Sequence, residues 1–349
     1  MEDLLKKHSP YLLVDTTRLR DDSATDLKVS IVIPVRNEQE VMVELIAALQ
    51  AQTFRVAEIV IVDGGSTDQT VSISRNLTRG DDRFRVIEAG DATPGRGRNV
   101  GIEAARNDWI ALTDAGNRPE AQWLEELVKV VRRDPSVEIV YGNFEPITDS
   151  FFTRCAALAY VVAKQERDGH RIRAPSIVSA LMRREVWRRA GGFPDLRAAE
   201  DLMFIESVER QGSKVAWCPS ATVWWHLQPT LASTYRKFAV YSRHNVWAGR
   251  QRFWHYGIAR MYLLALPFVV LAIAHRAWWL AILIAGFAVR IASSIWQRRE
   301  QRGLLWALNP IQFLGVALIV LTIDLATFVG WIQALGQRPA DRPAPESVT

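Results

Sequence analysis

The first half of the chain alternates between short apolar runs and amphipathic stretches. Apolar runs of strand length occur at 29–35, 58–63, 83–89, 109–114 and 138–142. Stretches with helical spacing lie between them, at 38–52, from about 66, at 96–106 and at 120–133. Strands that alternate with helices in this way predict an α/β domain with a mostly parallel sheet.

After Gln211 the pattern changes to long apolar stretches, which lie at 258–274, 277–293 and 311–335. The third is longer than the roughly 20 residues that a helix needs to cross a bilayer, and the first two are near the lower limit of about 17. We therefore expect an α-helical membrane module of about three transmembrane helices. A shallow hairpin or a buried helical pair is the alternative for the first two stretches.

Charge is distributed unevenly along the chain. The net charge of +5 arises between Arg236 and Arg302, where eleven basic residues accompany a single acidic one, Glu300. Because this basic segment adjoins apolar stretches, it favours a membrane surface over nucleic acid as its partner. The QRREQR run at 297–302 is expected to stay in the cytoplasm. That places the α/β domain on the cytoplasmic side and the C-terminal tail outside.

The N-terminus and the cysteines agree with a cytoplasmic location. The first 28 residues contain no apolar stretch of secretory length. Cys155 and Cys218 are too far apart for a CxxC motif and too few for a disulfide scaffold, so we expect buried free thiols. The expected organisation is an N-terminal extension (1–28), an α/β domain (29–230), a basic amphipathic juxtamembrane linker (231–256), the membrane module (257–335) and a disordered tail (336–349).

Two acidic residues, Asp63 and Asp114, end predicted strands. Ligands bind outside the carboxyl ends of strands in open α/β sheets, so both are candidate site residues, although a strand-end Asp also caps a following helix. A glycine-rich helix start at 95–101 suits a phosphate. Its glycines are spaced one residue too long for a dinucleotide fingerprint, which argues against a dehydrogenase.

Four ordered blocks resemble a family 2 glycosyltransferase. They are VSIVIPVRNE from 29, IVIVDGGSTDQT from 59, GRGRNVGIEAARNDWIALTDAGNRPEAQWLEEL from 95 and GGFPDLRAAEDLMF from 191. The resemblance covers about 29–227 and implies a GT-A-type (Rossmann-like) sheet flanked by helices. It also implies an inverting hexosyltransferase that uses a nucleotide-sugar donor.

The resemblance places the nucleotide-sugar site at the ends of the strands and at the start of the glycine-rich helix. The residues that it implies are Pro34, Arg36, Glu38, Asp63, Gly65, Arg98, Asn99 and Asp114. The sequence departs from the family pattern at Gly64, where a second acid is common.

A divalent cation, Mg or Mn, is implied at Asp114, which matches the first acid of the family's DxD motif. Gly116 stands at the third position of that motif, so only one carboxylate remains. One carboxylate and two phosphate oxygens can hold a hard cation when substrate is present. His226 falls where many GT-A enzymes place a histidine near the metal. The alternative is a packed histidine beside two tryptophans.

Glu200 and Asp201 resemble the family's xED motif, in which the Asp is the general base. Inverting transfer requires that a base remove the proton of the acceptor hydroxyl as its oxygen attacks. The alternative is an acidic pair that the helix dipole favours at a helix N-terminus. We expect Asp201 to be the base, with Glu200 beside it.

The acceptor is expected to be a hydroxyl of a lipid-linked or membrane-proximal glycan, as in cell-envelope polysaccharide synthesis. The QxxRW block of processive synthases is absent from the sequence, which favours single or few-step transfer. A polyprenyl-phosphate sugar synthase is one alternative. A non-catalytic membrane-anchored nucleotide-sugar binding protein is the other. The expected location is the cytoplasmic (inner) membrane, with several spans and the catalytic domain facing the cytoplasm.

Overall fold

The computed structural model describes residues 12–14, 27–167, 170–300 and 302–336. Nearly all of the expected N-terminal extension, and all of the expected tail beyond Gly336, lie outside these residues. The chain divides into two compact units, each of which is described by itself. The first comprises Met1–Ile147 and Gln165–His226, and the second comprises Thr148–Lys164 and Leu227–Thr349.

A nine-stranded sheet forms the centre of the first unit. Its strand order is β1-β11-β7-β10-β5-β2-β3-β4, and β6 pairs with β11. Most neighbouring strands are parallel, whereas β10 and β6 run antiparallel to their partners. The strands are β1 (Leu12–Leu13), β2 (Val29–Val35), β3 (Glu58–Asp63), β4 (Phe84–Glu88), β5 (Trp109–Leu112), β6 (Asn117–Pro119), β7 (Ile139–Pro146), β10 (Ala180–Arg183) and β11 (Val215–Trp225).

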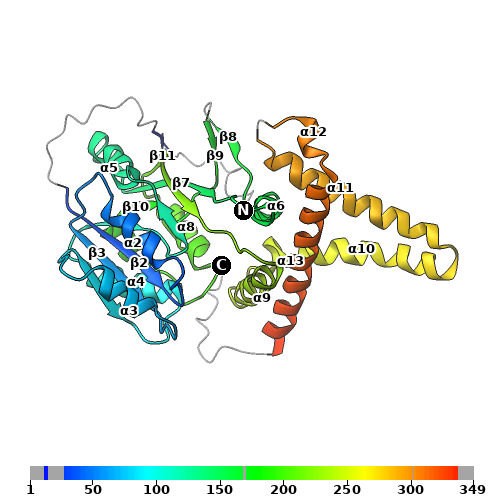
Figure 1. Ribbon diagram of the computed structural model, residues 1–349, viewed down its shortest axis with the longest axis horizontal. Coiled ribbons are helices and arrows are strands. Elements are labelled where there is room, and N and C mark those ends of the chain that lie inside the picture. The colour runs from blue at the N-terminus through cyan, green and yellow to red at the C-terminus, as the bar shows by residue number, and fades with distance from the viewer. Residues whose placement is uncertain (1–11, 15–26, 168–169, 301, 337–349) are drawn as a thin grey trace. The chain divides into compact units, whose positions relative to one another are not determined.

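Helices flank this sheet, as the apolar pattern predicts (Figure 1). They are α2 (Met42–Gln50), α3 (Thr70–Leu77), α4 (Pro94–Ala104), α5 (Trp123–Arg133), α7 (Arg184–Arg189) and α8 (Glu200–Arg210). Two further strands, β8 (Gln165–Arg167) and β9 (His170–Ile172), pair with each other as a separate hairpin. Every residue of β3 is buried, as expected of a strand covered on both faces. The expected α/β class with a mostly parallel sheet is confirmed.

The helix expected from residue 38 begins only at Met42. Asn37 adopts a positive φ of 54°, and the N–H of Glu38 donates to Thr70 Oγ1 at 2.8 Å. These contacts hold the segment after β2 as a loop. The sequence pattern also missed β10, because four residues that run antiparallel between β5 and β7 carry no distinctive period.

The second unit is helical. It contains α6 (Phe151–Tyr160), α9 (Leu231–Trp247), α10 (His255–Ala274), α11 (Leu280–Arg298), α12 (Leu304–Ala307) and α13 (Pro310–Gly336), with short 3-10 turns at Gln251–Phe253 and Ala277–Trp279. Among the described residues, three helical segments are long and apolar enough to cross a membrane: His255–Ala274, Ala277–Arg298 and Pro310–Gly336. Figure 1 shows α10 and α11 as a long hairpin within this unit.

One buried charge cluster joins these three helices. Asp324 of α13 is almost completely buried and receives two hydrogen bonds from Arg290 of α11, at 2.5 and 2.9 Å. Tyr262 of α10 donates to the same carboxylate at 2.9 Å. Because a buried carboxylate without partners is costly, this cluster fixes how the three helices face one another.

Candidate active site

Asp63 lies at the carboxyl end of β3 and shapes the turn that follows. Its carboxylate accepts the N–H groups of Gly65, at 3.0 Å, and Ser66, at 3.1 Å. Gly65 has a positive φ of 83°, which favours glycine. A Cβ at Gly64 would lie 2.5 Å from the carbonyl oxygen of Ala92. The backbone therefore leaves no room for a second acid at Gly64, which accounts for the departure from the family pattern.

The loop after β2 is tied to neighbouring loops. Arg36 forms an exposed ion pair with Asp91 at 2.5 Å. Asn37 accepts the N–H of Thr67 at 2.8 Å and donates its own N–H to Ser66 Oγ at 2.9 Å. Of the expected residues here, Arg36 presents a charged side chain to solvent, and Glu38 is anchored through its backbone.

Helix α4 packs unusually close to its neighbours. Thr93 caps its N-terminus by accepting the N–H of Arg96. A Cβ at Gly95 would lie 2.0 Å from the carbonyl oxygen of Pro194, and one at Gly101 would lie 2.3 Å from Val32 Cγ1. The glycines therefore let α4 lie against β2 and the loop before α8. This close packing brings Arg98 into the interior.

Arg98 connects two parts of the expected site. It is only 2% exposed, and its guanidinium donates to Asp114 Oδ1 at 2.7 Å and to Glu200 Oε1 at 2.8 Å. Burial alone would lower the pKa of Arg98, but the charges of Asp114 and Glu200 outweigh it and raise this pKa. Arg98 is thus a permanent positive charge between two acids that lie 86 residues apart in the sequence.

Asn99 holds the loop that precedes the acidic pair. Its side-chain Nδ2 donates to the carbonyl of Phe193 at 2.8 Å. Its Oδ1 accepts the N–H of Phe193 at 2.8 Å and Nε1 of Trp187 at 2.9 Å. The Asn99 amide is therefore engaged by the protein itself and positions residues 193–200.

Glu200 and Asp201 begin α8 in a strained setting. Ala199, the residue before them, has a positive φ of 72°. Burial raises the pKa of Glu200 to about 7, and the charge of Asp201 adds to this effect while Arg98 opposes it. Burial also raises the pKa of Asp201, against the opposing charge of Arg98. Asp201 is half-buried, whereas Glu200 is buried.

The Asp114 loop offers a single carboxylate to a cation. The side chain of Asp114 is 32% exposed, and Arg98 occupies one of its oxygens. A Cβ at Gly116 would meet no atom within 4 Å, so steric exclusion does not account for the missing second acid. Within the described ranges, no group of three or more His, Cys, Asp or Glu side chains could hold a metal ion.

His226 lies beside this loop, because its N–H donates to the carbonyl of Gly116 at 3.0 Å. Its Nε2 pairs with Glu44 Oε2 at 2.8 Å, and Arg118 donates to the other oxygen of Glu44 at 2.8 Å. Sequence reasoning missed Glu44, which lies in the first turn of α2 and 182 residues from its histidine partner. No local motif marks such a contact.

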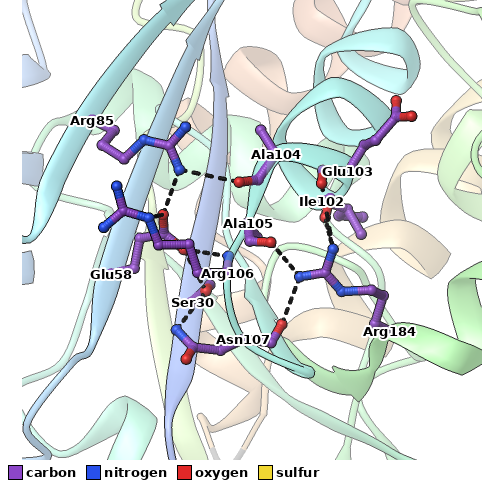
Figure 2. A network of polar contacts seen from close by, with 10 residues as sticks. All are labelled: Ser30, Glu58, Arg85, Ile102, Glu103, Ala104, Ala105, Arg106, Asn107 and Arg184. Atoms are coloured by element: carbon purple, nitrogen blue, oxygen red, sulfur yellow. Dashed lines mark hydrogen bonds and ion pairs between the residues drawn. The ribbon is translucent and has the colours of Figure 1, made fainter.

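A network of buried polar contacts fixes the segment between α4 and β5 (Figure 2). Glu58 accepts hydrogen bonds from Ser30 Oγ at 2.8 Å, Arg85 at 2.6 Å and the N–H of Arg106 at 2.8 Å. Burial alone would raise the pKa of Glu58, but these hydrogen bonds lower it overall. Glu58 is therefore a stable buried anion.

Arg184 completes the network from the other side. Figure 2 shows its guanidinium among the carbonyl groups at the C-terminal end of α4. It donates to Ile102 at 2.9 Å, Ala105 at 2.5 Å and Asn107 at 2.8 Å. Because α4 carries Arg98 and β5 leads to Asp114, this segment sets the distance between those two side chains.

Residues 30–190 match the family model described as glycosyl transferase family 2. The chain is 27% identical over 197 residues to the uncharacterized glycosyltransferase EpsJ of Bacillus subtilis, covering 54% of this chain and 57% of that protein. It is 34% identical over 120 residues to glycosyltransferase AglE of Haloferax volcanii, covering 34% of this chain and 39% of that protein. The matches thus span less than two thirds of these relatives.

A solved structure shares the fold. It is the mannosyltransferase PcManGT from Pyrobaculum calidifontis in complex with GDP-Man and Mn2+, with a TM-score of 0.61 and 20% sequence identity. The similarity covers 96% of this chain and 92% of that one. At this identity the likeness shows the fold alone, and it confirms the expected GT-A-type architecture.

We predict that Arg184→Met lowers the free energy of unfolding by about 2–4 kcal/mol, because the carbonyl groups at the end of α4 lose their donors. Chemical denaturation of the full-length protein in detergent measures this. The matched control is Arg188→Met on the same helix, whose side chain is exposed and forms only a surface pair with Glu185. It should change stability by less than about 0.5 kcal/mol. Equal effects of the two substitutions would contradict the assigned role.

Proposed function

Residues 30–190 form a family 2 glycosyltransferase domain, and from this premise we propose that the protein transfers a sugar from a nucleotide-sugar donor to a hydroxyl group with inversion. One observation carries the proposal. Arg98 is shared between Asp114 and Glu200, which places a donor-side acid and the acidic pair of α8 around one buried charge. A single displacement needs the donor-side acid and the acidic pair of α8 in one site.

The reaction itself needs one base. The acceptor oxygen attacks the anomeric carbon, its proton passes to Asp201, and the bond to the nucleoside diphosphate breaks with the electron pair on the leaving oxygen. Asp201 suits this role because it is half-buried, whereas Glu200 is buried and engaged with Arg98. Glu200 positions Arg98. A raised carboxylate pKa brings the base closer to neutral pH, where general base catalysis is most effective.

The donor site is proposed at the carboxyl ends of β2, β3 and β5. Asp63 and Asn99 already have protein partners, so they shape this site together with Pro34, Gly65 and Glu38. Arg36 and Asp114 remain accessible, and their side chains are proposed to face the donor. PcManGT, which shares the fold, is in complex with a nucleotide sugar, GDP-Man.

A divalent cation fits this site only together with the donor. Asp114 would hold it through one carboxylate oxygen, with the diphosphate supplying further oxygens, and His226 is the proposed neighbouring ligand. The pairing of His226 Nε2 with Glu44 leaves Nδ1 for that role. When bound, such a cation neutralises charge on the departing diphosphate. PcManGT is in complex with Mn2+.

The membrane module is proposed to place the reaction at a cytoplasmic membrane surface, with the basic linker at the headgroups. Asp324 and Arg290 lie near the middle of α13 and α11. Their pairing joins the middle of α11 to the middle of α13. The acceptor is proposed to be a hydroxyl on a lipid-linked or membrane-proximal glycan.

We predict that Asp201→Asn lowers kcat by about two to four orders of magnitude, because the amide cannot take the hydroxyl proton. Donor affinity should remain nearly unchanged. Transfer from a donor chosen by thermal shift into membrane lipids measures kcat, and calorimetry measures donor binding. In the parent, kcat/KM should fall as the pH drops through the raised pKa of Asp201, since the base must be ionised.

Glu206→Gln on the same helix is the control for the loss of one carboxylate. It should retain parental activity and the same fall in kcat/KM at low pH. The residual activity of Asp201→Asn should not show this fall. Parental turnover in Asp201→Asn would make Asp201 a helix-capping acid. A polyprenyl phosphate acceptor, which is already ionised and needs no base, would then be the better account.

Sugar transfer should depend on a divalent cation. Because Asp114 supplies a single carboxylate, activity should require millimolar rather than trace Mg or Mn and should be lost in Asp114→Ala. Metal titration of the transfer rate measures this. Asp134→Asn removes a surface acid that pairs with Lys214, and it should leave the titration unchanged. Full turnover in excess chelator would refute the cation.

A further inference from the structure

The second unit contains an apolar groove of about 500 Å³ where α6, the start of α9 and the first half of α13 meet. Residues that define it are Phe151 and Cys155 from α6, Leu231 and Ala232 from α9, and Gly315 and Leu318 from α13. The groove exists because α6 and α13 approach closely at one point: a Cβ at Gly315 would lie 2.7 Å from Cys155 Sγ.

The groove offers nothing to a polar ligand. The hydroxyl of Thr230 at its rim is used in a capping box, in which it accepts the N–H of Ser233 at 3.1 Å. Cys155 Sγ contacts the carbonyl of Gln312. None of the described residues that line the groove has a buried side-chain nitrogen or oxygen without a hydrogen-bond partner. The lining is therefore suited to an apolar occupant.

One wall of the groove continues into a surface suited to lipid. Four leucines follow one another at helical spacing along α13, and each is 46–69% exposed. They are Leu314, Leu318, Leu321 and Leu325. Because α13 is a candidate membrane span, this stripe would face the acyl chains of a bilayer. Leu318 belongs both to the stripe and to the groove. A chain already in the bilayer can therefore enter the groove without crossing water.

We propose that this groove binds the hydrocarbon chain of a lipid-linked acceptor. The inference deepens the proposed function and rests on it for the reaction. The apolar groove would hold only the hydrocarbon chain, so the polar head group would remain outside it. Bulk membrane lipid is the competing occupant, and the experiment separates the two.

The test is photolabelling of the full-length protein in phosphatidylcholine nanodiscs. Three probes carry a photoreactive group in the chain: a hexose linked to a geranylgeranyl chain, a hexose linked to diacylglycerol, and phosphatidylcholine. One of the two hexose probes should label the peptides around 229–232 and 315–319 more strongly than the phosphatidylcholine probe does. The hexose probe that labels more strongly identifies the type of hydrocarbon chain that the groove binds. Ala232→Trp should fill the groove and reduce this labelling by about tenfold, which corresponds to about 1.4 kcal/mol.

The matched control is Ala285→Trp, an exposed position on α11 outside the groove, and it should label like the parent. Unchanged thermal unfolding of Ala232→Trp shows that the variant is folded. Equal labelling by phosphatidylcholine, or undiminished labelling of folded Ala232→Trp, would overturn the proposal. If Ala232→Trp instead unfolds, peptide mapping in the parent decides, and labels confined to other segments would overturn it.

Labelling involves no sugar transfer, so the two proposals fail separately. Asp201→Asn should be labelled like the parent. If the groove is not labelled but transfer still depends on Asp201, only the proposed binding of a lipid chain in the groove is refuted. If the groove is labelled but Asp201→Asn transfers sugar at the parental rate, only the proposed reaction is refuted.

Discussion

The guanidinium of Arg98 donates to Asp114 and to Glu200 from a position closed to solvent. Two carboxylates on different elements would repel each other without it, and a buried arginine would be costly without them. Each partner therefore depends on the others. The close glycine packing of α4, the Asn99 contacts and the Arg184 network all serve to place this one charge.

In the second unit, too, a buried charge is held by partners from other elements, here among apolar helices. Asp324 is stabilised by Arg290 and Tyr262 from two other helices, so a single carboxylate determines how the three candidate spans associate. The small residues of α9 and α13 add close packing, since a Cβ at Gly330 would lie 2.2 Å from the carbonyl oxygen of Ala239. Both units thus use one buried charged residue, Arg98 or Asp324, to hold elements that are distant in the sequence.

Much of the fold could be predicted from local pattern, because buried strands are apolar and strand ends bear Asp63 and Asp114. Contacts between distant residues could not be predicted. Nothing near Arg98 indicates that its partner is Glu200, 102 residues away, and nothing near His226 indicates Glu44. The reason for Gly64 became clear only when the carbonyl of Ala92 was seen to occupy the space of a side chain.

In the proposed reaction Asp114 and Glu200 act through a shared arginine, Arg98. A double-mutant cycle on kcat/KM, with Asp114→Asn, Glu200→Gln and the double variant, tests it most directly. Residues that share a partner are coupled, so the losses should be non-additive by about 1 kcal/mol or more. Losses that add to within about 0.5 kcal/mol would show two independent acids and would contradict the shared site.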